Sequence, residues 1–223
     1  HPGIKAVGFT GSERVGMILQ QQINQRPEPI PFYGELGSVN PQVLLPNIAN
    51  SDAENLANTL VTSVVLGGGQ FCTNPGIWFV PESATEFVKQ ARCAFEAQVS
   101  TPLLTQSIAK SYRETVARRR DMANVESVAQ GQSLASHHST PALFKVSAAT
   151  FLANSELHQE VFGPSAIIVT YDTEQTLMKL VEGLAGQLTA SILGGAQEIE
   201  AHSDLVNKLK DIILSCSLFR RKY

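Results

Sequence analysis

The stretch GGGQFCTNPG, residues 67–76, places a cysteine between a run of glycines and an Asn-Pro-Gly turn. Three consecutive glycines allow the backbone to adopt positive φ angles and to approach another segment closely. The Asn-Pro-Gly sequence then favours a turn directly after the cysteine. A thiol on such a loop, beside free backbone N–H groups, can attack a carbonyl carbon and stabilise the resulting oxyanion. Cys72 is therefore a candidate nucleophile, and its alternative interpretation is a buried structural cysteine.

The composition is that of a globular protein with a sizeable core. The chain has 223 residues, of which 43% are hydrophobic and 17% are charged, enough for one large domain or two small ones. The formal net charge of −3 gives no support for binding to nucleic acid or to a membrane surface. The sequence shows neither an apolar run long enough to span a membrane nor a signal peptide. These features predict a soluble, cytoplasmic protein.

Cysteine and histidine usage argues against a disulfide framework and against a metal site. The three cysteines are Cys72, Cys93 and Cys216. They are odd in number, widely spaced and without a CxxC pair, which indicates free thiols in a reducing compartment. His137 and His138 have no evident third ligand, so they indicate a surface loop and no metal. The basic run at residues 118–120 is short and isolated, and it predicts a solvated helix face.

Short apolar runs alternate with helical patterns along most of the chain. This alternation predicts an α/β fold in layers, with a partly parallel sheet. We expect residues 77–80 to form a central strand, and residues 143–146 and 151–152 to form edge strands. The other expected strands are residues 4–9, 30–33, 43–45, 166–171 and 188–193. The expected helices are residues 13–22, 52–66, a segment starting at 83, and residues 107–118, 174–182 and 197–209.

The first strand is followed by Gly11 and Ser12 and then by a helix. A strand, a glycine turn and a helix N-terminus together offer backbone N–H groups and a positive dipole end to a phosphate. Ser12 has two equally supported interpretations, as the cap of this helix or as a hydrogen-bond donor to a phosphate. The spacing from Gly11 to Gly16 does not match the GxGxxG pattern, so by itself it is a weak nucleotide signal.

Glu35 follows the second expected strand and lies between Gly34 and Gly37. A solvated loop carboxylate is the simpler interpretation of this position. The alternative is a general base, which requires that burial raise the pKa of the carboxyl group towards neutrality.

Four stretches, taken in this order, resemble the aldehyde dehydrogenase superfamily. They are FTGS at residues 9–12 with Gly16, ELG at 35–37, GQFC at 69–72 and EVFGP at 160–164. Each stretch is weak alone, but four in order with suitable gaps are a strong signal. Residues 34–41 and 69–76 look most like the branch of 2-oxoglutarate semialdehyde (2,5-dioxovalerate) dehydrogenases and the bacterial NADP-dependent fatty aldehyde dehydrogenase.

The resemblance implies an aldehyde-dehydrogenase-like three-layer catalytic domain with a partial Rossmann-type cofactor domain. Residues 1–36 would be the C-terminal part of the cofactor-binding domain, residues 37–210 the catalytic domain, and residues 211–223 a divergent or truncated tail. The chain starts without methionine, and family members are longer, so we expect it to be a piece of a larger protein. The intact protein is expected to be a homo-oligomer.

Carried over residue by residue, the resemblance implies a covalent mechanism for aldehyde oxidation. Cys72 would attack the aldehyde to give a thiohemiacetal, and transfer of hydride to NAD or NADP would leave a thioester. Glu35 would activate the water that hydrolyses this thioester to the carboxylic acid. Two other interpretations remain open. The chain is a truncated, inactive remnant that keeps only the catalytic-domain fold, or it hydrolyses esters and thioesters with Cys72 and Glu35 and without a cofactor.

The resemblance also implies four cofactor-binding residues. Gly11 and Ser12 would face the pyrophosphate at the helix N-terminus. Glu160 would hold the ribose hydroxyl groups on the nicotinamide side, and Phe162 would pack near the nicotinamide ring.

Overall fold

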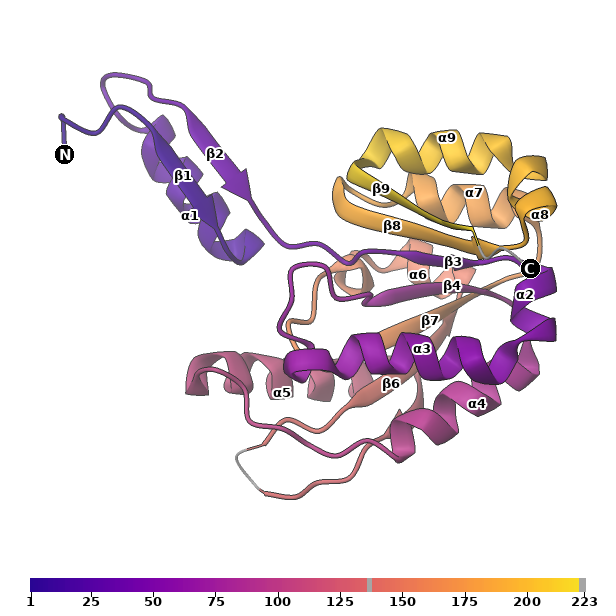
Figure 1. The fold of residues 1–223 in the computed structure, drawn as a ribbon. Helices are drawn as coiled ribbons and strands as arrows, with labels where there is room; N and C mark the ends of the chain where they lie inside the picture. Colours follow the sequence, from indigo (N-terminus) through magenta and orange to yellow (C-terminus); the bar gives the residue numbers. More distant parts are fainter. Residues whose placement is uncertain (136–137, 221–223) are drawn as a thin grey trace. The chain divides into compact units, whose positions relative to one another are not determined.

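The computed structural model describes residues 1–135 and 138–220, and it divides into two compact units (Figure 1). Unit 1 is His1–Ser38, and unit 2 begins at Val39. The assignment of residues 1–36, 37–210 and 211–223 to a cofactor domain, a catalytic domain and a tail stays a prediction.

Unit 1 is a small β-α-β arrangement. Strand β1 (Val7–Thr10) is followed by helix α1 (Glu13–Asn24) and by strand β2 (Phe32–Glu35), which pairs with β1 in parallel. Both strands begin later than the apolar runs predict. The pairing starts at Pro31, whose carbonyl accepts from the N–H of Val7. Pro31 has no N–H group of its own, so it cannot donate a hydrogen bond that would extend the ladder further.

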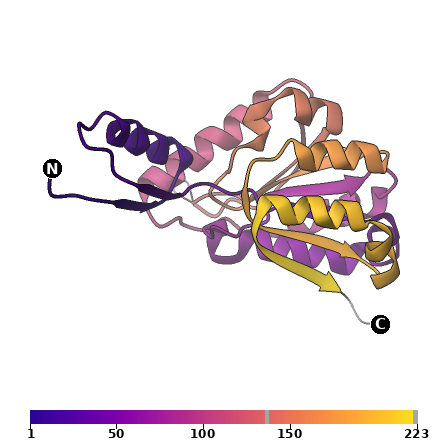
Figure 2. The same cartoon turned by 90° about the horizontal axis from the view of Figure 1, so that it is seen from above.

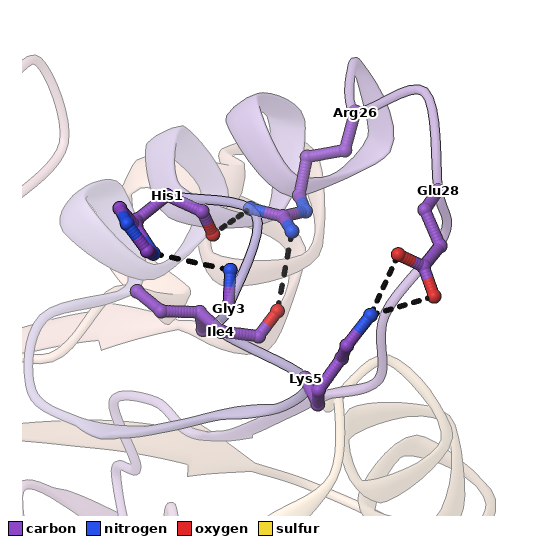
Figure 3. A network of polar contacts seen from close by, with 6 residues as sticks. All are labelled: His1, Gly3, Ile4, Lys5, Arg26 and Glu28. Atoms are coloured by element: carbon purple, nitrogen blue, oxygen red, sulfur yellow. Dashed lines mark hydrogen bonds and ion pairs between the residues drawn. The ribbon is translucent and has the colours of Figure 1, made fainter.

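The residues before β1 are held to the connection between α1 and β2 (Figure 3). The guanidinium of Arg26 donates to the carbonyls of His1 at 3.2 Å and Ile4 at 3.1 Å. Lys5 forms an ion pair with Glu28 at 2.7 Å, but both side chains are well exposed, so the pair contributes little to stability. These contacts explain why the apolar start of the chain runs beside the connection and does not extend β1.

Unit 2 contains a seven-stranded sheet in the order β5-β6-β7-β4-β3-β8-β9. All neighbouring strands are parallel except β5 and β6. The strands are β3 (Gln42–Leu44), β4 (Ile77–Pro81), β5 (Glu126–Gln130), β6 (Ala142–Ser147), β7 (Ser165–Tyr171), β8 (Gln187–Gly194) and β9 (Ile213–Arg220). The predicted central place of β4 is confirmed.

The predicted edge strands are wrong. Residues 143–146 lie in β6, which is covered on one side by the more polar β5 and on the other by β7. Residues 151–152 lie in a helix, because Ser147 caps it with its side chain by accepting from the N–H of Thr150.

Helices cover both faces of the sheet, which confirms the layered α/β fold (Figures 1 and 2). Helices α3 and α4 cover one face, and α5, α6, α7 and α9 cover the other. Their bounds, with the short helices, are α2 (Pro46–Ser51), α3 (Ala53–Val65), α4 (Thr85–Glu96), α5 (Gln106–Asp121), α6 (Ala148–Ala153), α7 (Glu174–Glu182), α8 (Ala196–Ala201) and α9 (Ser203–Ile212). Short 3₁₀ turns follow α3 and α6, namely η1 (Leu66–Gly69) and η2 (Ser155–His158). Within the described ranges, no helix is both long and apolar enough to cross a membrane.

Successive residues of β4 supply the two cores. Trp78 faces α4, where its ring centroid lies 6.0 Å from that of Phe87 and 6.1 Å from that of Phe95. Phe79 faces the opposite side and meets Phe151 of α6 edge-on, at 6.1 Å between centroids. Because side chains alternate along a strand, one central strand fills both sides of the sheet.

We predict that Phe79→Ala lowers the free energy of unfolding of unit 2 by about 3–5 kcal/mol, because it empties a fully buried aromatic site. Urea denaturation followed by the fluorescence of Trp78, the single tryptophan, measures this loss. Leu104→Ala is the matched control, since Leu104 is 84% exposed and its truncation should change stability by less than about 0.5 kcal/mol. Equal losses in the two variants would contradict the core assignment.

Candidate active site

The glycine run forms the tight turn that leads from α3 to the cysteine. Gly67, Gly68 and Gly69 have φ angles of 57°, 68° and 69°, a region that residues with a side chain rarely adopt. Gly69 has a second reason to be glycine. A Cβ atom there would lie 2.2 Å from the carbonyl carbon of Gly163, so the two backbones touch.

The side chain of Gln70 holds the glycine turn with two hydrogen bonds. Its Nε2 donates to the carbonyl of Gly67 at 3.0 Å, and its Oε1 accepts from the N–H of Leu104 at 2.8 Å. The side chain therefore joins the glycine turn to the segment that precedes α5.

Asn74, two residues after the cysteine, binds the loop from inside. Its Nδ2 lies 2.8 Å from the carbonyl oxygen of Gly69, 3.2 Å from that of Val64 and 3.3 Å from that of Gly163. One amide therefore links the end of α3, the glycine turn and the segment at residues 160–164.

Asn40 fixes the backbone of Cys72 itself. The side chain of Asn40 is fully buried, and its Nδ2 donates to the carbonyls of Cys72 at 2.8 Å and Asn74 at 2.9 Å. Its Oδ1 accepts from the N–H of Thr189 at 3.2 Å and from the hydroxyl of the same residue at 3.0 Å. The residue has a φ of 46°, which asparagine tolerates better than most side chains do. Asn40 thus ties the cysteine loop to β8.

Cys72 is exposed on this fixed loop, which excludes the interpretation as a buried structural cysteine. Cys93 on α4 is exposed too, so exposure alone does not distinguish the two thiols. The difference is that the Cys72 backbone is held by a buried amide, whereas Cys93 lies on an ordinary helix.

The segment at residues 160–164 lies against the cysteine loop. Glu160 is half-buried and Phe162 is 36% exposed. The next residue, Gly163, contacts Gly69 and accepts from Asn74. The structure therefore brings together the GQFC and EVFGP stretches, which are almost ninety residues apart in the chain (72 against 160).

Gly11, Ser12 and Glu35 lie together in unit 1. The N–H of Gly11 donates to the carbonyl of Glu35 at 3.1 Å, continuing the pairing of β1 and β2. Ser12 occupies the N-cap position of α1, but its side chain accepts no capping hydrogen bond, so the capping interpretation finds no support. All three residues are exposed.

The prediction of a solvated face for residues 118–120 is wrong for Arg119, which is 2% exposed, while Arg118 and Arg120 are exposed. His137 lies outside the described residues. Over 1–135 and 138–220, no cluster of three or more His, Cys, Asp or Glu residues is placed to hold a metal ion.

Sequence reasoning missed the roles of Asn40 and Asn74. Asn74 was recognised only as part of a turn, and Asn40 only as part of the stretch 34–41. An asparagine next to a proline is an ordinary turn signal. Nothing in the local pattern shows that these two amides meet the same loop.

A mostly parallel sheet with helices on both faces, and an exposed thiol on a loop held by a buried amide, define an α/β protein with a candidate site at this loop. The profile of the "Aldehyde dehydrogenase family" matches residues 1–204, and the chain belongs to this family. The resemblance inferred from the four stretches is confirmed.

Two curated relatives also match the expected branch. The chain is 37% identical, over 94% of its length, to an alpha-ketoglutaric semialdehyde dehydrogenase of Acinetobacter baylyi, and 37% identical, over 86%, to alpha-ketoglutaric semialdehyde dehydrogenase 2 of Azospirillum brasilense. It spans 40% and 37% of the lengths of these relatives. A crystal structure of a putative aldehyde dehydrogenase from Burkholderia cenocepacia matches 99% of the chain with a TM-score of 0.78 and 22% identity, and the chain covers 47% of it.

We predict that Asn40→Asp lowers the free energy of unfolding of unit 2 by about 3–5 kcal/mol, because a buried carboxylate would face two carbonyl oxygens that it cannot pair with. Urea denaturation and hydrogen exchange of the cysteine loop measure the effect. Asn50→Asp is the control, since Asn50 also donates to a carbonyl but is exposed. Unchanged exchange around Cys72 in the Asn40 variant would disprove the proposed anchoring.

Gly69→Ala should displace the cysteine loop, because its Cβ has no room against Gly163 and its φ is positive. We expect a loss of stability of about 2–4 kcal/mol together with a changed rate of Cys72 alkylation. Gly195→Ala serves as the comparison, since nothing lies within 4 Å of a Cβ there. If both variants label and unfold alike, the contact between Gly69 and Gly163 does not hold the loop.

Proposed function

We propose that this chain carries the catalytic machinery of an NAD(P)-dependent aldehyde dehydrogenase, in which Cys72 is the nucleophile. The observation that supports this most is the exposed thiol of Cys72 on a loop whose backbone is bound by the buried amide of Asn40. Positioning a thiol while leaving it accessible is what attack on a carbonyl carbon requires.

The first step is carried by Cys72. Its thiolate attacks the aldehyde carbon, forming a carbon–sulfur bond and giving a thiohemiacetal. The backbone N–H of Cys72 belongs to the same fixed loop and would stabilise the negative charge that develops on the aldehyde oxygen. A thiolate suits this role because sulfur is a strong nucleophile towards carbonyl carbon, and the thioester formed later is activated for hydrolysis.

The described residues fit a nicotinamide dinucleotide. Gly11 and Ser12 lie exposed at the N-terminus of α1, and the side chain of Ser12 makes no capping bond, so both remain available to a pyrophosphate. The carboxylate of Glu160 suits ribose hydroxyl groups, and the half-open ring of Phe162 suits a flat nicotinamide. When bound, NAD or NADP supplies the hydride acceptor for the oxidation.

The last step belongs to Glu35. The thioester carbonyl on Cys72 is attacked by a water molecule whose proton is taken by the Glu35 carboxylate. This forms the carbon–oxygen bond of the acid and releases the thiolate. The position of Glu35 at the end of β2, beside Gly11, makes unit 1 the source of both the general base and the phosphate-binding turn.

The aldehyde is proposed to be the semialdehyde of a dicarboxylic acid or a long-chain aldehyde. Both relatives at 37% identity are named for alpha-ketoglutaric semialdehyde, which favours the first.

Cys72→Ala should abolish both the formation of acid from alpha-ketoglutaric semialdehyde with NAD or NADP and the hydrolysis of a nitrophenyl ester. Cys93→Ala is the matched control, because its thiol is exposed too, and it should keep both activities. Glu35→Gln should still release a first burst of nitrophenol but slow later turnover by about 10²–10⁴-fold, because it removes the general base. Burst kinetics separate the two steps.

Two results of the same measurements would contradict the proposed dehydrogenase activity. Nitrophenol release that needs Cys72, without aldehyde oxidation or binding of NAD(P) by calorimetry, would indicate a cofactor-independent hydrolase. If the chain neither binds a cofactor nor hydrolyses the ester, it is an inactive remnant of the catalytic fold.

A further inference from the structure

Arg119 is a charged side chain in an apolar place. It lies on α5 and is 2% exposed, whereas its neighbours Arg118 and Arg120 are exposed. Burial lowers the pKa of Arg119 to about 10, so the guanidinium is still charged at neutral pH. Burying a charge is costly unless hydrogen bonds compensate for it. The acceptors of this guanidinium therefore indicate what the residue is for.

These acceptors are backbone carbonyls that lie directly before Glu160. The Nη2 of Arg119 donates to the carbonyl of Gln159 at 2.8 Å and, more weakly, to that of Leu157 at 3.4 Å. Hydrogen bonds from a charged donor are stronger than those between neutral groups. Arg119 therefore fixes the backbone at the N-terminal side of Glu160.

Tyr112, also on α5, fixes the other side of the same segment. The single proton of its hydroxyl is shared between two carbonyls, that of Thr140 at 2.7 Å and that of Pro164 at 3.1 Å. Its ring leaves no room for a side chain at Gly163, where a Cβ would lie 2.2 Å from Cδ2. Burial raises the pKa of the Tyr112 hydroxyl above its ordinary value, so it remains a donor at any physiological pH.

Tyr112 and Arg119 are seven residues apart, which puts them on one side of α5, roughly 10 Å apart along its axis. Between the two carbonyls that they bind, those of Gln159 and Pro164, lie only residues 160–163. We propose that α5 is a template that sets the conformation of this segment, with Arg119 and Tyr112 as positioning residues for Glu160 and Phe162. The inference rests on the proposed function, in which these two side chains meet the nicotinamide ribose and ring.

Contacts on the approach to the segment are consistent with a fixed backbone. His158 stacks on Phe151, with 4.1 Å between ring centroids and 16° between ring planes, and its Nε2 lies 2.9 Å from the carbonyl of Phe151. Glu156 is paired with Arg118 at 3.2 Å. Residues 156 and 158, which precede the segment, are therefore held by their own side-chain contacts. The hydrogen bonds of Arg119 then hold the backbone up to Gln159.

The test is hydrogen exchange on the 223-residue chain. Arg119→Met keeps much of the side-chain volume but removes the donors, and it should speed exchange of residues 157–164 about tenfold. Arg120→Met, on the same helix but exposed, should leave this exchange unchanged. Arg119→Lys keeps a cation and should restore part of the protection. Wild-type exchange in Arg119→Met, or acceleration that extends equally to β4, overturns the proposal.

A second readout separates positioning from general stability. Arg119→Met should raise the dissociation constant for NADPH about tenfold while the alkylation rate of Cys72 stays at the wild-type value. Unchanged NADPH affinity, or Cys72 alkylation altered to the same degree, overturns the positioning role. If Arg119→Met does not fold, Tyr112→Phe removes only a hydroxyl and should speed exchange at residues 163–165, and wild-type exchange there overturns the template.

The two proposals fail in different ways. If the wild-type chain binds neither NADH nor NADPH, the proposed function fails for this chain, but the exchange measurement still decides whether α5 holds the segment. If NADPH binds and Arg119→Met changes neither exchange nor affinity, the function stands and the template is wrong.

Discussion

The site in unit 2 depends on one close contact, the backbone of Gly69 against that of Gly163. A Cβ at Gly69 would lie 2.2 Å from the Gly163 carbonyl carbon, so the two segments meet without any side chain between them. The amide of Asn74 spans the same junction by reaching carbonyls on both sides. Because the contact is made by backbone atoms, its geometry has little freedom, and the positions of the thiol and of Phe162 follow from it.

Buried polar side chains fix the backbone of the two segments in a way that apolar packing cannot. Apolar contacts are not directional, whereas an amide or a guanidinium binds a particular carbonyl at a particular angle. Asn40 uses its amide to fix the carbonyl of Cys72, and Arg119 uses its charge to fix that of Gln159. Asn40 uses both its amide nitrogen and its amide oxygen in hydrogen bonds, whereas Arg119 bonds through Nη2 and its buried Nε has no hydrogen-bond partner. Asn40 and Arg119 therefore each hold one of the two segments that carry the proposed chemistry.

The sequence predicted the features that depend on local pattern. The alternation of apolar runs and helical patterns was sufficient for the layered α/β fold, for the central place of β4 and for the bounds of α7. The glycine turn before Cys72 was also visible, since glycine and proline signals are local. Features set by distant partners were not. Arg119 lies in a run of three arginines, and nothing in that run marks the one whose acceptors come from residues 157 and 159. Likewise, residues 151–152 are an apolar pair whose local pattern does not distinguish a strand from a helix. In the structure they lie in α6, which Ser147 caps.

The chemistry proposed for this chain is divided between its two units, and this division has a physical consequence. The thiol and the Glu160 segment belong to one framework in unit 2, in which Gly69 contacts Gly163 and Asn74 donates to the carbonyl of Gly163. The parallel pairing of β1 and β2 is a second framework, and it holds Glu35, Gly11 and Ser12. The chain that leaves unit 1 is bound at once, because the N–H groups of Val39 and Asn40 both donate to the side chain of Gln187. Nucleophile activation by the fixed loop and water activation by Glu35 therefore rest on separate frameworks. A substitution in unit 1 that disturbs the pairing of β1 and β2 is expected to affect both cofactor binding by Gly11 and Ser12 and thioester hydrolysis by Glu35.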